Sequence, residues 1–143
     1  MAAAILSHYF ENANHAAIGD ATGLVASTVA GVFYLGLHTA SPGEAGDQTT
    51  NEATYTSYAR VSVARSTAGW TVSTADPANV TNDAAVTFPA ATGGSDTITH
   101  FSVGTDSSAA GNLLFHGALD ASLAVSSGIT PEFAINAFNI TLD

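Results

Sequence analysis

The acidic side chains of one polar tract are the first candidates for metal or substrate chemistry. Glu44, Asp47 and Glu52 lie within "HTASPGEAGDQTTNE" (38–52), a stretch rich in Ser, Thr and Gly. A calcium-binding loop needs several oxygen ligands at short, regular spacing, as in DxDxDG. Here two carboxylates stand three positions apart and the next follows five positions later. The calcium motif is absent, so we interpret these carboxylates as solubilising or contact-forming groups.

Histidines are the second candidate ligands. The chain has five of them: His8, His15, His38, His100 and His116. None of them forms a close zinc motif such as HExxH. The last three fall in predicted strands beside large apolar residues, where convergence on a metal is one alternative. We favour the other, in which they are hydrogen-bonded or exposed strand residues, and we predict no metal site.

No motif for a nucleophile or a nucleotide phosphate is present. There is no GxSxG elbow, and the Gly-rich stretches "GDATG" (19–23) and "ATGGSD" (91–96) have no lysine. A carboxylate pair for glycoside hydrolysis would meet only in the fold, so the sequence leaves that alternative open. Because nothing indicates such a pair, we predict no catalytic residue, no cofactor and no enzymatic activity.

Positive charge is almost missing. Arg60 and Arg65 are the only Lys or Arg residues, against twelve Asp and Glu, and the formal net charge is −10. Phosphate contacts depend on Lys and Arg, so the composition argues against nucleic acid and against an anionic membrane surface as partners. Strand alternation places the two arginines on opposite faces. We predict that each bonds a carboxylate, within the chain or across a subunit contact.

Aromatic residues offer a second kind of surface. Trp70, Tyr55 and Tyr58 could line a sugar-binding platform, but packing in a core or an interface is the interpretation that we favour. The predicted interface residues are Glu44, Asp47, Glu52, Arg60, Arg65 and Trp70.

Residues 1–28 are predicted to form a short amino-terminal helix and a connecting arm. "AILSHYFENANHAA" (4–17) allows an amphipathic helix, and "GDATGL" (19–24) breaks it. The first residues have no basic region and too short an apolar run for a signal peptide or membrane span, and the chain has no cysteine. We therefore expect synthesis in a cytoplasm, without disulfides.

Residues 29–143 are predicted to form one β-domain. Short β-branched and aromatic runs alternate with Gly, Pro, Asn and Asp, which is typical of strands joined by turns. The spacing indicates a mainly β fold, an antiparallel β-sandwich or jelly roll. Its longest connection covers about residues 40–55, with a turn at Pro42–Gly43 and backbone freedom at Gly46. The predicted strands are 33–38, 59–63, 69–73, 84–89, 97–104, 112–119, 119–125 and 132–142.

Five segments of the sequence form a recognisable set of motifs. They are "FYLGLHTASPGEAGDQTTNEATYTSYARVSVAR", "GWTVS", "AAVTFPAATGGSDTITHFSVGT", "GNLLFHGAL" and "AFNITLD", in this order. Together they resemble a family of small virion structural proteins of tailed bacteriophages, often labelled tail fibre proteins, with the pattern YLGLHTADPGEAG, YAR, TFP, THFGIGT and LLFxGAL. Ser41 stands where that pattern has Asp, which argues against a functional carboxylate there.

The resemblance implies a non-enzymatic component of the virion. Because the β-domain is short, acidic and free of cysteine, we expect a capsid cement or decoration protein on the outside of the head, assembled as a homotrimer and bound to the major capsid protein or other virion proteins. Low charge fits burial between subunits, because interface cores are depleted of charge. The alternative is a tail fibre or tail-tip subunit that binds a host receptor or glycan, and an enzyme such as a glycan depolymerase ranks last.

Overall fold

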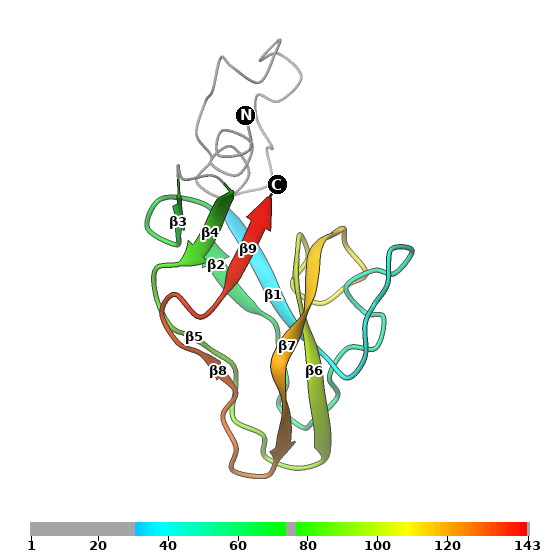
Figure 1. Ribbon diagram of the computed structural model, residues 1–143. Helices are drawn as coiled ribbons and strands as arrows, with labels where there is room; N and C mark the ends of the chain where they lie inside the picture. Colours follow the sequence, from blue (N-terminus) through cyan, green and yellow to red (C-terminus); the bar gives the residue numbers. More distant parts are fainter. Residues whose placement is uncertain (1–30, 74–76, 143) are drawn as a thin grey trace. The chain divides into compact units, whose positions relative to one another are not determined.

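The structure is a computed structural model that describes residues 31–73 and 77–142. These residues form β-strands and contain no helix, which confirms the mainly β prediction. The predicted amino-terminal helix and arm (1–28) lie outside the described residues, and the sandwich or jelly-roll arrangement stays a prediction. The strands are β1 (Val32–His38), β2 (Val61–Ala64), β3 (Trp70–Val72), β4 (Ala78–Asn82), β5 (Val86–Thr87), β6 (Ser95–Gly104), β7 (Leu113–Ser126), β8 (Glu132–Phe133) and β9 (Asn139–Leu142) (Figure 1).

The described residues fall into two compact units. The first, here the loop unit, comprises Phe33–Val63 and Thr87–Glu132. The second, here the Trp70 unit, comprises the described residues among 31–32, 64–86 and 133–142. A sheet of order β2-β1-β6-β7 belongs mainly to the loop unit, and a sheet of order β3-β4-β9 belongs to the Trp70 unit. Strands β5 and β8 form a two-stranded sheet.

Strand β1 lies inside its sheet, between β2 and β6. Its pairing with β6 is antiparallel and sets His38 opposite His100. The sequence suggests alternate burial along this strand, but Leu35, Gly36, Leu37 and His38 are all buried. Gly36 is required here, because a Cβ atom would lie 2.8 Å from the hydroxyl oxygen of Ser102.

Strands β6 and β7 form a long antiparallel hairpin, in green and orange in Figure 1. The sequence predicted two strands, 112–119 and 119–125, where the structure has one strand of 14 residues. The two halves are separated by a register shift, because residues 119–122 of β7 stand opposite Thr99 alone. The shift explains why the sequence pattern changes at Leu119.

Aromatic packing is the main feature of the Trp70 unit. Trp70 is fully buried and meets the ring of Phe138 edge-on, with 5.7 Å between centroids and 70° between planes. Phe133 meets Phe138 in the same manner, at 5.7 Å and 88°. Burying such rings contributes strongly to stability.

Strand β4 was not predicted from the sequence "ANVTN". Its Asn82 is fully buried, and its side chain bonds three backbone groups that lie outside the strands. The amide nitrogen donates to the carbonyls of Ala84 and Ala134, and the amide oxygen accepts from Phe138 N. Burying a side-chain amide costs little free energy when its donor and acceptor groups are hydrogen-bonded in this way. The last predicted strand, 132–142, is interrupted by a turn at Asn136, whose φ is 60°. Its second half, β9, stands at the edge of its sheet among the described strands, whereas the sequence suggested a central strand.

Within residues 31–73 and 77–142, no helix has the length and apolar character needed to cross a membrane.

Candidate functional site

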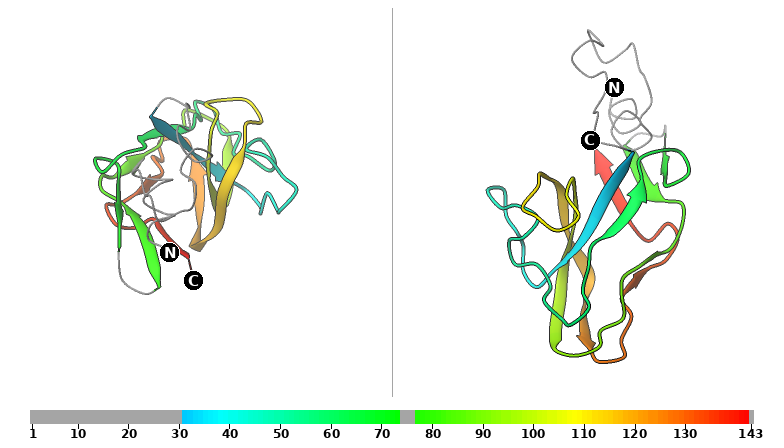
Figure 2. Two further views of the ribbon diagram at one scale, coloured as in Figure 1. Left: turned by 90° about the horizontal axis from the view of Figure 1, so that it is seen from above. Right: turned by 180° about the vertical axis from the view of Figure 1, so that it is seen from behind.

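The β1–β2 connection (residues 39–60) is a chain of turns rather than a structureless loop. Figures 1 and 2 show it beside the loop that joins β6 to β7 (residues 105–112). Its tip is a turn in which Gly46 N donates to Gly43 O at 3.2 Å, and Gly43 has a φ of 71°. Gly46 serves close approach rather than backbone freedom, because a Cβ atom there would clash with the Pro42 carbonyl.

Asp47 closes the next turn of the connection. Its Oδ1 accepts hydrogen bonds from the hydroxyl of Thr49 at 2.7 Å, from Thr49 N at 2.8 Å and from the hydroxyl of Thr50 at 3.3 Å. These bonds, led by that of the Thr49 hydroxyl, lower the pKa of the Asp47 carboxyl. Asp47 therefore stabilises the turn. One of its two carboxylate oxygens, Oδ1, is already hydrogen-bonded to the neighbouring residues.

Gln48 is the fully buried anchor between the two loops. Its Oε1 accepts from Thr105 N and Asp106 N, both at 2.9 Å, and its backbone N donates to Ala110 O at 3.0 Å. The side chain occupies space left by two glycines, Gly104 and Gly111, where a Cβ atom would collide with it. Gln48 was not predicted from the sequence, because a polar residue inside a polar tract carries no signal of burial.

Glu52 and Arg60 form a forked ion pair under the connection. Arg60 Nε lies 2.6 Å from Glu52 Oε1 and Arg60 Nη2 lies 2.7 Å from Oε2, and 1% of the arginine side chain is exposed against 16% of the glutamate. Burial alone would lower the pKa of Arg60, but the hydrogen bond and charge of Glu52 raise it. This contact is the carboxylate partner that the sequence predicted for Arg60.

Tyr58 links the ion pair to β1. Its hydroxyl donates to Glu52 Oε1 at 2.9 Å and accepts from Leu37 N at 3.0 Å. Burial is the first cause of a strongly raised pKa of the Tyr58 phenol, so the hydroxyl stays protonated and keeps its donor role.

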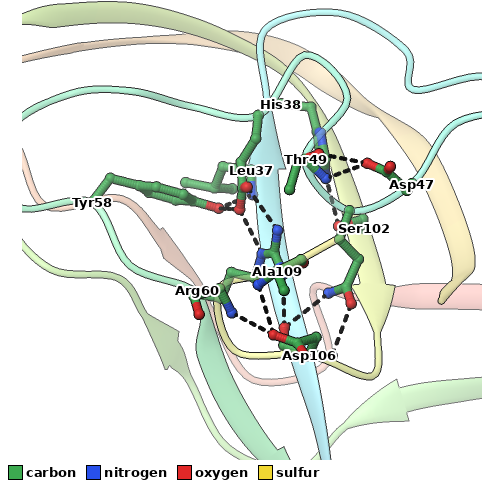
Figure 3. Close-up of polar contacts among 12 residues, drawn as sticks. Leu37, His38, Asp47, Thr49, Tyr58, Arg60, Ser102, Asp106 and Ala109 are labelled. Atoms are coloured by element: carbon green, nitrogen blue, oxygen red, sulfur yellow. Dashed lines mark hydrogen bonds and ion pairs between the residues drawn. The ribbon is translucent and has the colours of Figure 1, made fainter. Parts of the chain in front are cut away.

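Arg60 also holds the second loop. Its Nη1 donates to the carbonyls of Asp106 at 2.8 Å and of Ala109 at 2.7 Å, and Figure 3 shows Arg60 among Tyr58, Asp106 and Ala109. Asp106 Oδ1 accepts from Ser108 N and Ala109 N, which lowers the pKa of its carboxyl. Arg60 and Gln48 thus unite the exposed residues of 39–60 and 105–112 into one surface, here the loop platform.

His38 and Ser102 have the geometry of a nucleophile and base but not the access. His38 Nε2 lies 2.7 Å from Ser102 Oγ, and Nδ1 lies 2.9 Å from Thr50 O. Both side chains have no exposed surface, so a substrate cannot reach the hydroxyl. The pair instead ties the connection to β1 and β6. This arrangement matches the interpretation of His38 as a hydrogen-bonded strand residue.

A pH-dependent stability follows from His38. Burial lowers the pKa of its imidazole below the ordinary 6.5, although the Thr50 carbonyl and the charge of Glu52 oppose the shift. The unfolded chain then binds more protons than the folded chain as the pH falls through about 6.5, so this contribution to stability is complete above that pH and is lost below it. We expect the free energy of unfolding, measured with urea, to decrease from about pH 7.5 to about pH 5.

The His38→Gln variant should show a weaker dependence on pH across that window. The window lies above the range in which Asp47 and Asp106, with their lowered pKa values, take up protons. His116→Gln is the matched control for the loss of one strand histidine. An equal decrease in the wild-type protein and in His38→Gln would contradict the role given to His38.

The Gln48 slot gives a second prediction. Gly104→Ala places a Cβ atom inside the Gln48 side chain, which must leave its hydrogen bonds to Thr105 N and Asp106 N. We expect a loss of roughly 1–3 kcal/mol in the free energy of unfolding, since overpacking and broken buried hydrogen bonds both contribute. Gly93→Ala is the control, because its nearest atom is Thr56 Oγ1 at 3.3 Å. Equal losses in both variants would count against the slot.

The predicted interface residues are spread over both units. Glu44 is exposed at the tip of the connection, Asp47 and Glu52 are half-buried in it, and Arg60 is buried beneath it. Arg65 and Trp70 belong to the Trp70 unit, where 4% and 0% of their surface is exposed. Trp70 and Tyr55 are buried. Their burial confirms that these two rings pack inside the protein and do not line a sugar-binding platform. The interface role of the six residues stays a prediction.

The loop platform presents polar side chains to the solvent. It exposes hydroxyls and amides at Ser41, Thr49, Asn51, Ser107 and Asn112, with the carboxylate of Glu44 at its tip. Its one arginine is buried, so the platform is an acidic surface held rigid from below. Across the part of the chain that the structure describes, no group of three His, Asp or Glu side chains could hold a metal ion.

Comparison with known proteins gives one family. The family described as podophage GP4 fiber I protein gp80 matches residues 2–141 of the chain. No curated protein matches the chain.

Proposed function

The chain belongs to the podophage GP4 fiber I protein gp80 family, and from this premise we propose that it is a subunit of a bacteriophage tail fibre. Membership makes it a phage structural protein and a virion component. The family match over residues 2–141 is the observation that carries the proposal. The sequence favoured a capsid cement over a tail fibre. The family match gives the cement role no support and favours the tail fibre.

The proposed role is structural. We propose that the protein is not an enzyme, that it is made in the host cytoplasm, and that its partners are further copies of itself and other virion proteins, with a homotrimer as the expected assembly. Nucleic acid is an unsuitable partner, because the chain has no lysine and its two arginines are buried.

The loop platform is the proposed contact with a virion protein or a host surface receptor. Two loops far apart in sequence are joined by hydrogen bonds that the buried side chain of Gln48 accepts and that of Arg60 donates, while their outer residues remain exposed. A rigid support under polar loops preserves their shape before binding and so reduces the entropic cost of association.

The copy number of the protein in purified particles tests the proposed place. A fibre subunit should be present in a few copies per particle and should stay with the tail when heads and tails are separated. Quantitative mass spectrometry of the two fractions measures both. A copy number close to that of the major capsid protein, with the chain in the head fraction, would reject the fibre role.

A matched pair of arginine variants tests the loop platform. Ala45 is exposed beside Glu44 at the tip of the connection, and Ala68 is exposed on a turn of the Trp70 unit. Ala45→Arg offsets the negative charge of Glu44 and adds a bulky side chain without touching the anchors, so it should reduce the number of copies incorporated per particle or the binding of particles to cells. Ala68→Arg should change neither quantity. Equal behaviour of the two variants would remove the loop platform from the proposal.

A further inference from the structure

Strand β7 ends the four-stranded sheet and leaves a backbone edge available. Its hydrogen-bonded neighbour is β6, and no other described strand pairs with it. Natural edge strands are protected from pairing with other chains by lysines, prolines, bulges or short length. Strand β7 has 14 residues without Lys or Pro. Its register with β6 shifts at Leu114 and at residues 119–122, and the pairs from Leu123 to Ser126 are regular.

Residues 118–130, here the β7 edge segment, are unusually accessible for a strand and its following turn. Leu119 and Val125 are the two residues of the segment that are not exposed. Leu123 and Ile129 have 37% and 40% of their surface exposed, and only Ile135 joins them among the exposed large hydrophobic residues of the described chain. In the turn after β7, Gly128 N donates to Ala91 O and Ile129 O accepts from Ala91 N, so the open backbone groups are those of β7 itself. Exposed apolar side chains next to an open strand edge are typical of a protein contact.

The charge of the segment indicates what covers it. Asp120 is the only charged residue between 107 and 131, although the chain carries twelve carboxylates and a net charge of −10. Two copies of such a chain repel each other wherever carboxylates meet, and like charges at a contact are costly. A contact between copies has to avoid carboxylates, whereas a basic partner would be drawn to them. The β7 edge segment meets the first requirement.

We propose that the β7 edge segment is the contact between copies of this chain, in which backbone groups of β7 extend the sheet and Leu123 and Ile129 lose their exposure. The proposal deepens the self-association of the proposed function by naming its surface. It concerns the isolated protein and is independent of the place of the protein on the particle.

Two matched pairs of glutamate variants test the contact. Ile129→Glu and Ala124→Glu add a carboxylate to the segment, and Ile135→Glu and Ala134→Glu make the same changes at exposed positions of the Trp70 unit. Circular dichroism and thermal melting first establish that each variant folds like the wild type. Sedimentation velocity and native mass spectrometry over a concentration series then give the dissociation constant of the assembly.

The wild type should assemble, and the dissociation constant should rise about tenfold or more in Ile129→Glu and Ala124→Glu while the two control variants stay at the wild-type value. A wild-type protein that remains monomeric throughout the series would overturn the proposal. So would folded segment variants that assemble like the wild type, or control variants that are weakened equally. An assembling protein that occurs on heads would reject the fibre role and leave this contact standing.

Discussion

Replacing Arg60 with Met should lower the free energy of unfolding by roughly 3–5 kcal/mol, the range found when one partner of a buried ion pair is removed. The variant leaves the carboxylate of Glu52 without its cation and the carbonyls of Asp106 and Ala109 without a donor. The loss should therefore include release of the 105–112 loop from the β1–β2 connection. Urea unfolding followed by circular dichroism measures the energy, and amide hydrogen exchange of residues 105–112 measures the release.

A double-mutant cycle separates the ion pair from general damage. Glu52→Gln alone should be destabilising, and Arg60→Met together with Glu52→Gln should cost clearly less than the sum of the two, with a coupling of at least about 1 kcal/mol. Arg60→Lys is the control for charge without the fork, and it should recover only part of the loss because an ammonium cannot bond both carboxylate oxygens and both carbonyls. An Arg60→Met loss under about 1 kcal/mol would contradict the structural role of the pair.

Replacing Trp70 with Ala should cost about 3–5 kcal/mol, as large-to-small changes of buried aromatic residues do. The indole is fully buried, and its edge-on contact with Phe138 is lost together with its volume. Thermal melting and urea unfolding followed by circular dichroism measure the effect. Trp70→Phe keeps a ring against Phe138 and should lose distinctly less.

Trp70 also reports on its own unit, because it is the only tryptophan in the chain. Its fluorescence in the wild-type protein should have the blue-shifted emission of a buried indole and move to longer wavelength on unfolding. A wild-type emission already typical of exposed tryptophan, together with a small loss in Trp70→Ala, would contradict the burial on which this prediction rests.

Local patterns in the sequence predicted most of the strands. Short apolar runs ended by Gly, Pro and Asn identify β1, β2, β3 and β6, because alternation and turn residues act over a few positions. Strand β4 was not predicted, because its burial depends on a hydrogen bond between Asn82 and Ala134, which are distant in the chain. The break at Asn136 was not predicted either, because the positive φ of this asparagine leaves no mark in the alternation of apolar and polar residues.

The candidate site was predictable in its location but not in its chemistry. The unusual length of the β1–β2 connection and the scarcity of arginine both pointed to this region. A carboxylate partner for Arg60 was also predicted, because arginine makes charge-assisted bonds to carboxylates, but the sequence did not single out Glu52. Gln48 and the 105–112 loop could not be found, because their association depends on the β1–β6 register, which brings segments about 57 residues apart together.

The position of the protein on the particle decides between a tail fibre and a capsid cement. A fragment of green fluorescent protein or a gold-binding tag, attached at the carboxyl end and visualised in a reconstruction of intact particles, locates the chain. We expect density at the tail, on or at the base of its fibres. Density distributed over the capsid shell, with none at the tail, would contradict it.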